Sequence, residues 1–284
     1  MRTVYVNGVF CPEDEGRISI FDRGFLFSDG VYEVTSVVEG RLIDFANHMA
    51  RLRRSMAELA LKAPAGEDAL LSIHRALVDK NALTEGLIYL QVTRGAADRD
   101  FLYPPEETQP SLVLFTQAKS LIETSAATTG LSIVTLPDLR WQRRDIKTVQ
   151  LLYSSMAKME AKRRGASDAW MVEDGLVTEG SSSNAYIVDA SGTLVTRPLS
   201  HAILPGITRT AVLRLAEETG LAVEERAFTV EEAKAAREAF ITSASSFVLP
   251  VVTIDGARIG NGQPGTITRR LRAIYLEEAL KTAI

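Results

Sequence analysis

Cysteine, histidine and long apolar runs are all scarce in this sequence. A single cysteine, Cys11, cannot form an internal disulfide or a multi-cysteine metal site, which excludes a disulfide-rich secreted domain and favours a reducing cytoplasm. The three histidines show no HExxH spacing, which argues against a zinc enzyme. No apolar run approaches the ~18 residues of a membrane span, and the N-terminus lacks the apolar core of a signal peptide. We therefore expect a soluble cytoplasmic protein.

An excess of charge of either sign is also missing. The 32 Lys and Arg residues nearly balance the 36 Asp and Glu residues, leaving a net charge of −4. Such a balance offers no basic surface for nucleic acid or an anionic membrane, so neither is an expected partner. With 46% hydrophobic residues among 284, the composition is typical of a globular protein with one large domain or two modest ones.

Strands and helices both occur in the first 118 residues. Asn7-Gly8 between two apolar runs predicts a hairpin, because a type I′ turn needs positive φ at both central positions. Asp44 can cap a helix, and the apolar residues after it are spaced by three and four, which predicts a helix over 45–59. The other expected elements here are strands over 31–38, 86–94 and 111–117 and a helix around 70–77.

The chain from residue 119 onward is richer in strands. The expected strands cover 131–136, 169–172, 176–178, 185–188, 193–196, 221–226, 239–242 and 251–254, and the expected helices cover 156–164, 208–219 and 264–282. The polar stretch over 117–120 marks a boundary. We therefore predict an α+β protein with a small N-terminal domain over 1–118 and a larger C-terminal domain over 119–284.

Several polar residues suit the binding of a phosphate-bearing cofactor, although each has a commoner explanation when taken alone. Lys147 follows Arg143 and Arg144, and nearby cations favour the neutral amine that a Schiff-base lysine needs, but most lysines are solvated. Residues 206–208 open a helix whose first N–H groups can bind phosphate, as can those of any helix.

Two further segments could contact the same ligand. The hydroxyl-rich stretch from Thr242 to Ser246 follows an apolar strand, and Glu179 lies between two strands among small residues. A carboxylate at a strand end can accept a hydrogen bond from a protonated ring nitrogen. Both stretches are equally compatible with ordinary loops.

Tyr32, Arg51, Arg94 and Arg99 are candidates for binding a substrate carboxylate. Arginine suits this role because its planar fork donates two parallel hydrogen bonds to a carboxylate. A solvated arginine and a core tyrosine are the commoner cases, so none of these residues decides the function by itself.

Taken together and in order, these segments resemble the fold type IV pyridoxal-phosphate enzymes, and among them the D-amino acid aminotransferases. The resemblance covers nearly the whole chain, and several short motifs in the right order are far more specific than any one. The motifs are Asp22-Arg23-Gly24-Phe25, Ser28-Asp29-Gly30-Val31-Tyr32-Glu33, residues 94–99, residues 140–147, residues 177–184 and Leu204-Pro205-Gly206-Ile207-Thr208-Arg209.

The resemblance implies a cofactor, pyridoxal 5′-phosphate, and a role for each matching residue. Lys147 would hold the cofactor through its amine and then move a proton between the substrate Cα and the cofactor C4′. Glu179 would keep the pyridine nitrogen protonated, so that the ring accepts electrons, and Leu204 would pack on the ring. The implied phosphate ligands are Arg51, the backbone N–H groups of Ile207 and Thr208, and the hydroxyl of Ser243.

The implied reaction moves an amino group between a D-amino acid, such as D-alanine, and a 2-oxo acid. Tyr32 and Arg99 would bind the substrate α-carboxylate in a trap completed across a homodimer interface. Phe101 departs from the family pattern, since the best-known members carry a histidine at this position. We therefore expect an altered carboxylate affinity or substrate range, with Asp98 and Asp100 competing for Arg99.

Other activities on the same fold remain open at this stage. They are branched-chain amino acid transamination, (R)-amine transamination and aminodeoxychorismate cleavage. A non-catalytic protein that binds a phosphate ligand is the alternative outside enzyme chemistry.

Overall fold

The computed structural model describes residues 1–284 and divides into two compact units. Unit 1 comprises Met1–Ser120, Ile146–Gln150 and Thr282–Ile284, and unit 2 comprises Leu121–Asp145 and Leu151–Lys281. This grouping differs from the predicted division in one respect that matters for function. The prediction places Lys147 in the C-terminal domain, but its segment belongs to unit 1, because Ile146 is buried in the hydrophobic core of that unit.

The sheet of unit 1 has the strand order β2-β1-β6-β5-β3-β4. Its strands are β1 (Thr3–Val6), β2 (Val9–Pro12), β3 (Gly30–Val38), β4 (Arg41–Leu42), β5 (Glu85–Thr93) and β6 (Ser111–Ala118). The predicted hairpin is confirmed: Val6 pairs with Val9, and Asn7 and Gly8 have φ values of 46° and 98°. The edge of β3 away from β5 pairs with β4 only at Val37 and Val38, and near the start of the strand Val31 pairs with Thr148.

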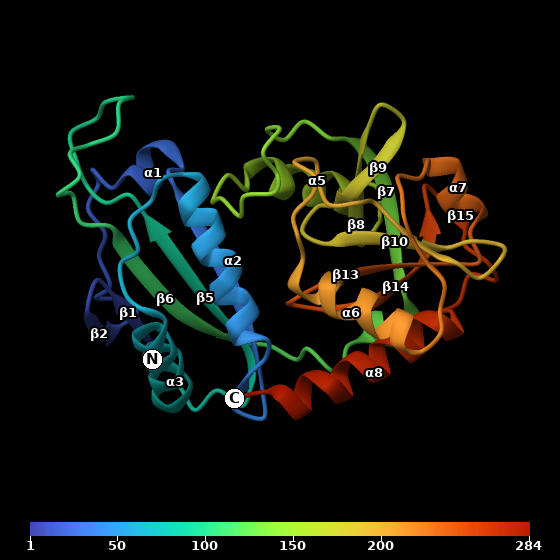
Figure 1. Ribbon diagram of the computed structural model, residues 1–284, viewed down its shortest axis with the longest axis horizontal. Helices are drawn as coiled ribbons and strands as arrows, with labels where there is room; N and C mark the ends of the chain where they lie inside the picture. The colour runs from blue at the N-terminus through green and yellow to red at the C-terminus, as the bar shows by residue number, and fades with distance from the viewer. The chain divides into compact units, whose positions relative to one another are not determined.

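The helices of unit 1 are α1 (Arg23–Phe27), α2 (Phe45–Glu58) and α3 (Glu67–Lys80). α2 packs on β3, and Figure 1 shows it lying along the sheet. It buries Met49, Leu52 and Met56, as the apolar spacing predicts. Asp44 does stand at its N-cap, but with a φ of 53° and without a side-chain capping bond. The short helix α1 lies in a segment that shows no apolar period.

The sheet of unit 2 has the order β12-β11-β10-β13-β14-β7-β8-β9, with β15 beside β14. It curls so that β9, at one end, contacts β10 in its interior. The strands are β7 (Leu131–Pro137), β8 (Asp168–Glu173), β9 (Leu176–Gly180), β10 (Asn184–Val188), β11 (Leu194–Thr196), β12 (Val223–Glu225), β13 (Glu238–Ser243), β14 (Phe247–Ile254) and β15 (Ala257–Arg258).

Five helices cover this curled sheet (Figure 1). They are α4 (Ser125–Thr129), α5 (Leu152–Arg163), α6 (Ile207–Glu218), α7 (Val230–Ala235) and α8 (Thr266–Thr282). α5 begins before the predicted residue 156, and α7 is absent from the prediction, although Thr229 and Glu232 form the capping box that signals its start. Both units combine helices and strands, so the predicted α+β class is confirmed.

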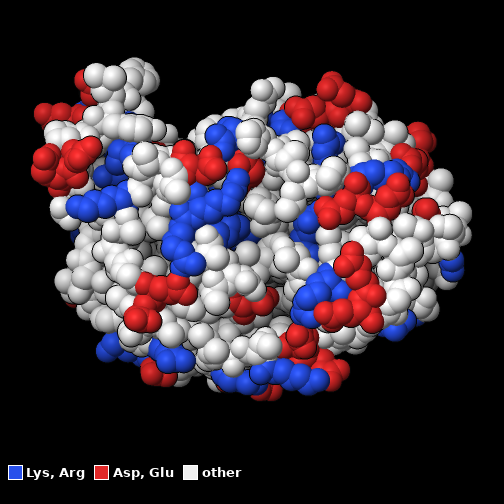
Figure 2. Space-filling view, in the orientation of Figure 1, with Lys and Arg blue, Asp and Glu red and all other residues white.

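The surface carries charges of both signs. In Figure 2, basic and acidic side chains lie side by side over much of the face shown, and many of them are paired, as Arg214 is with Glu218. No helix of the chain combines the length and the apolar character needed to cross a membrane.

Candidate active site

Lys147 lies beside the start of β3, along the edge that β4 leaves uncovered. Its carbonyl accepts a hydrogen bond from the backbone N–H of Tyr32 at 3.0 Å, and two residues later Val149 N–H donates to Gly30 at 3.1 Å. The backbone N–H of Lys147 donates to the Ser55 hydroxyl of α2 at 3.3 Å. The backbone of the lysine is therefore fixed by the sheet and by the helix packed on it.

The amine of Lys147 lies over an aromatic ring. Its Nζ is 4.2 Å from the ring centroid of Tyr32, whose ring stacks on Tyr89 at 5.5 Å. Lys147 is half-buried and forms no ion pair. An amine without a carboxylate partner remains available for covalent chemistry with a carbonyl group.

The two arginines before Lys147 are both paired with carboxylates. Arg143 pairs with Asp145 at 3.1 Å, and Arg144 pairs with Glu173 at 2.9 Å. Each cation is compensated by a carboxylate within unit 2, and the segment forms no strand along which side chains would alternate.

Glu179 of β9 is buried and held by three donors. Its Oε1 accepts from Arg140 Nη1 at 2.7 Å, and its Oε2 accepts from Asn184 Nδ2 and from the Leu204 backbone N–H, both at 3.1 Å. The sequence pattern places Glu179 between two strands, whereas it belongs to β9 itself and is 3% exposed. A surface loop is therefore excluded as its setting.

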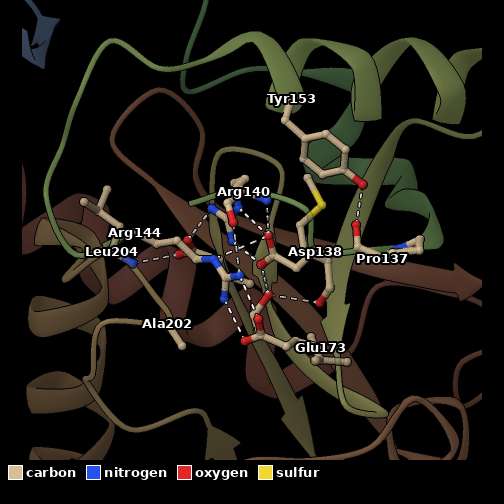
Figure 3. A network of polar contacts seen from close by, with 12 residues as sticks. Pro137, Asp138, Arg140, Arg144, Tyr153, Glu173, Ala202 and Leu204 are labelled. Atoms are coloured by element: carbon tan, nitrogen blue, oxygen red, sulfur yellow. Dashed lines mark hydrogen bonds and ion pairs between the residues drawn. The ribbon is translucent and has the colours of Figure 1, made fainter. Parts of the chain in front are cut away.

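A second layer of ion pairs holds Arg140 (Figure 3). Arg140 Nη2 donates to Asp138 at 2.7 Å, and the Thr178 hydroxyl donates to the same carboxylate at 2.6 Å. Arg144 lies 3.5 Å from Asp138 and makes two hydrogen bonds of 2.9 Å to Glu173. The network is not visible in the sequence because Arg140 and Glu179 are far apart along the chain.

Burial raises the pKa of Glu179, and the Arg140 guanidinium acts in the opposite direction by stabilising the carboxylate. Asp138 shows the opposite balance: burial would raise its pKa, but Arg140 holds it below the usual value. Of the two carboxylates that Arg140 contacts, Asp138 has a lowered pKa and Glu179 a raised one. Arg140 favours the ionised form of both. A carboxylate in that position can hold a proton on a nearby ring nitrogen.

The start of α6 offers donors to a phosphate. Gly206 is its N-cap and has no capping side chain, so the first N–H groups of the helix, including those of Ile207 and Thr208, lack that partner. The Thr208 hydroxyl is buried and also has no partner. A Cβ on Gly206 would lie 2.1 Å from Asn184 Oδ1, so this close approach requires glycine.

Ser243, the other predicted phosphate ligand in unit 2, ends β13, the strand on which α6 packs. Its hydroxyl lies 2.6 Å from that of Ser246 and 3.4 Å from that of Ser245. Hydroxyl groups that contact only one another can turn their O–H bonds towards a bound anion. Leu204, which donates its backbone N–H to Glu179, is half-buried.

Arg51 of α2 is held by a buried carboxylate. Its Nε and Nη2 donate to the two oxygens of Glu33 at 2.8 and 2.7 Å, and His48 Nδ1 lies 2.7 Å from the same group. Burial would raise the pKa of Glu33, but Arg51 and His48 lower it to about 2. The Glu33–His48 contact was not predicted, although His48 and Arg51 stand three apart on one helix face, a spacing that could have indicated a shared partner.

Arg99 lies on the exposed loop between β5 and β6. Its guanidinium carbon is 5.3 Å from the ring centroid of Phe27 and 5.5 Å from that of Phe101. Asp98 and Asp100 form no ion pair with it, so the expected competition does not occur. Arg94, the other candidate for a carboxylate clamp, is engaged by Asp29 at 2.8 Å.

Each unit thus carries part of the predicted site. Unit 1 brings together Lys147 and Tyr32, while Arg51 pairs with Glu33 and no contact joins Arg99 to any of them. Unit 2 carries Glu179, Leu204, Ile207, Thr208 and Ser243. The unpartnered Thr208 hydroxyl at a helix start and the charge-compensated Glu179 fit the phosphate and the ring nitrogen of pyridoxal 5′-phosphate, and the unpaired Lys147 amine fits its aldehyde.

Comparisons with known proteins agree with these features. The model of the class IV aminotransferase family matches residues 30–254. A D-alanine aminotransferase from Bacillus licheniformis is 41% identical over 98% of this chain and 99% of its own length. One from Staphylococcus aureus is 38% identical over 96% of each chain.

Solved structures share the fold. The Escherichia coli branched-chain amino acid aminotransferase superimposes with a TM-score of 0.89 at 23% identity, covering 98% of this chain and 94% of that one. The Thermobaculum terrenum branched-chain enzyme, solved with pyridoxal 5′-phosphate, gives a TM-score of 0.84 at 24% identity, with coverage of 99% and 94%.

The fold and the chemistry of the site residues define a pyridoxal-phosphate enzyme of fold type IV, as the sequence motifs indicated. The chain belongs to the class IV aminotransferase family. It is therefore a pyridoxal-phosphate-dependent aminotransferase, which confirms the predicted cofactor and sets aside the non-catalytic alternative.

Proposed function

We propose that the enzyme transfers an amino group between a D-amino acid, such as D-alanine, and a 2-oxo acid. The structural observation that carries the transaminase chemistry is the unpaired Lys147 amine fixed over Tyr32. The substrate class rests on the relatives: the Bacillus licheniformis D-alanine aminotransferase is 41% identical, whereas the branched-chain aminotransferase structures are 22–26% identical.

Each predicted cofactor ligand is given its role from its surroundings within its own unit. When bound, pyridoxal 5′-phosphate supplies a carbonyl for the amino group and a ring that accepts the electron pair left at Cα. The amine of Lys147 would hold the cofactor and, once free of it, would serve as the base that moves a proton between the substrate Cα and the cofactor C4′. Glu179 would accept a hydrogen bond from the protonated pyridine nitrogen, and Arg140 opposes the rise in the pKa of Glu179 that burial causes.

The remaining residues bind and orient. Ile207 and Thr208 would donate backbone N–H groups to the phosphate, and the hydroxyl of Ser243 and the guanidinium of Arg51 would complete its ligands. Glu33 fixes the orientation of Arg51. Leu204 packs against the ring and excludes water from it.

Tyr32 and Arg99 bind the substrate α-carboxylate, and the ring of Phe101 forms a wall beside Arg99. This wall leaves the (R)-amine activity as the second candidate, because an aromatic surface also accommodates a substrate without a carboxylate. Branched-chain transamination and aminodeoxychorismate cleavage lack such a specific observation.

The deciding experiment follows the visible absorption band of the bound cofactor as amino donors are added. We expect D-alanine to deplete the band and L-alanine and L-leucine to leave it intact. Depletion only by an L-amino acid, or equal depletion by an (R)-amine, would overturn the substrate assignment while retaining Lys147. Absence of the band after addition of cofactor would overturn the role of Lys147.

A homodimer and a cytoplasmic location complete the proposal. The trap around Arg99 is expected to be finished by a second copy, and the free thiol of Cys11 suits a reducing compartment. Light scattering of the holoenzyme at micromolar concentration tests the dimer. Detection of the native protein in the soluble cytoplasmic fraction tests the location.

A further inference from the structure

The loop that carries Arg99 has little regular structure of its own. Residues 97–110 form no helix or strand, and Phe101, Leu102 and Tyr103 are 79%, 75% and 59% exposed. Exposed loops with few buried contacts open readily. A residue on such a loop can recognise a substrate with a defined geometry only if something holds the loop.

Arg23, the first residue of α1, donates hydrogen bonds to the backbone of this loop. It is 3% exposed, and its Nη1 donates to the carbonyl of Asp100 at 2.6 Å and to that of Leu102 at 3.2 Å. These two carbonyls flank Phe101 and follow Arg99 directly. A single guanidinium therefore fixes the backbone on the C-terminal side of Arg99.

The carboxylate of Asp29, whose side chain is 10% exposed, orients Arg23 and joins it to Arg94. Asp29 accepts from Arg23 Nε at 2.8 Å and from Arg94 Nε and Nη2 at 2.8 and 3.1 Å. Arg94 also donates to the carbonyls of Leu59 and Ala60 at 2.8 and 2.9 Å, at the end of α2. The start of the loop is thereby attached to the helix that carries Arg51.

Aromatic rings complete the support. Arg94 lies 3.6 Å from the ring centroid of Tyr103, and Arg23 lies 4.5 Å from that of Phe27. The Phe27 ring meets Phe101 edge-on at 5.6 Å, and Arg99 lies over both rings. The chain of contacts thus runs from Asp29 through Arg23 and Phe27 to the guanidinium of Arg99.

Asp22 links the two residues at which the loop begins and ends. Its carboxylate accepts from the Thr93 hydroxyl at 2.9 Å and from the Ser111 hydroxyl at 2.6 Å, which stand before and after the loop. It also caps α1 by accepting from Gly24 N–H at 2.8 Å. The same short segment, residues 22–24, therefore supports both the base and the tip of the loop.

We propose that Arg23 is the positioning residue for substrate carboxylate recognition, acting with Asp29 and Arg94 to hold the loop on which Arg99 meets the substrate. This inference rests on the proposed function, since it takes Arg99 as the carboxylate ligand. Arg23 itself touches neither substrate nor cofactor. Its effect on the reaction passes through the loop backbone and the Phe27 ring.

The test compares Arg23→Gln with Arg99→Gln and with a control, Arg41→Gln, at an exposed arginine paired with Glu39. Arg23→Gln leaves Asp29 paired with Arg94, which favours retention of the fold. For Arg23→Gln holoenzyme we expect the KM for D-alanine to rise about 10-fold, the loss typical of charge-assisted hydrogen bonds, with kcat changed less than about 3-fold. Turnover of an (R)-amine without a carboxylate should not change.

A readout independent of the reaction is chymotryptic cleavage after Phe101 and Leu102, at sites that the substitution leaves intact. We expect cleavage to accelerate about 5-fold in Arg23→Gln and to stay unchanged in Arg41→Gln, since cleavage follows the population of the open loop. Faster cleavage together with a higher KM supports the inference. Unchanged cleavage overturns it, and so does an unchanged KM in Arg23→Gln when Arg99→Gln raises the KM.

Failure of the proposed function gives a different pattern. If Arg99→Gln leaves the KM for D-alanine unchanged, Arg99 is not the carboxylate ligand, and the positioning role falls with it even when cleavage accelerates. Should Arg23→Gln not fold, Phe27→Leu removes the aromatic support without touching the buried ion pairs. In that variant we expect the KM to rise about 3-fold, and an unchanged KM would overturn the inference.

Discussion

Glu179 and Arg99, the two charged groups assigned to the cofactor ring and to the substrate, are held in opposite ways. Glu179 is buried in a curled sheet, receives three hydrogen bonds and depends on a second layer of ion pairs behind Arg140. Arg99 is exposed on a loop and rests on two aromatic rings without any ion pair. The difference suggests that the charge at Glu179 must be held in a fixed position, whereas the surroundings of Arg99 tolerate substitutions.

A buried charge must be compensated in place, because desolvation costs several kcal/mol per ion. Glu179 therefore requires a dedicated network, and substitution of one member disturbs the others. Arg99 is exposed to solvent, so we expect that its neighbours can vary at a small cost in stability. Substrate range is accordingly expected to change more easily than the use of the cofactor.

The largest effect is expected when the amine assigned to hold the cofactor is removed. Lys147→Ala is expected to abolish the visible cofactor band and to lower turnover to background, because no other amine is held in its place. Absorbance and a coupled transaminase assay measure this. Lys62→Ala, at an exposed lysine, is the control, and retained turnover in Lys147→Ala would refute the assignment.

Glu179→Gln tests the rigid region directly. We expect kcat to fall about 100-fold, since the amide cannot stabilise a proton on the ring nitrogen as a carboxylate does. Glu173→Gln makes the same chemical change at the outer edge of the network and should alter kcat less than about 3-fold. Equal losses of kcat in the two variants would contradict a specific role for Glu179 and would indicate that the ion-pair network acts only as a unit.

Arg140→Gln tests the support of Glu179 through the pH dependence of kcat. Burial raises the pKa of Glu179 and Arg140 opposes that rise, so loss of the guanidinium raises the pKa further. More of Glu179 is then protonated at any given acidic pH, and the acid limb of the kcat profile is expected to move to higher pH. A profile that stays in place or moves to lower pH would contradict the role given to Arg140.

The smallest effect is expected at Phe101 in the exposed region. Phe101→His supplies a polar group beside Arg99, and we expect the KM for D-alanine to fall about 3-fold with kcat unchanged, as for one added hydrogen bond. Leu102→His, at the next exposed position, is the matched control. Steady-state kinetics on both variants would show whether the aromatic wall limits carboxylate affinity.

Local patterns predicted much of the fold but little of the support around the site. The hairpin at Asn7-Gly8 and the helix containing Met49 follow from turn chemistry and apolar spacing within a few residues. The pairing of Arg140 with Glu179, and of Arg23 with the loop after Arg99, joins distant parts of the chain that no local pattern connects. The motif containing Arg23 is visible in the sequence, but its partners are not.

The path of the chain through the two units has a consequence for its synthesis. Residues 146–150 and 282–284 belong to unit 1, and Ile284 exchanges two backbone hydrogen bonds with Leu42. A nascent chain that has emerged only as far as residue 120 lacks Ile146 in its core and the backbone partners of Gly30 and Tyr32. Most of unit 1 is thus translated before unit 2, yet unit 1 is completed only after it, and Lys147, the residue assigned to the cofactor, is made after the whole sheet of that unit.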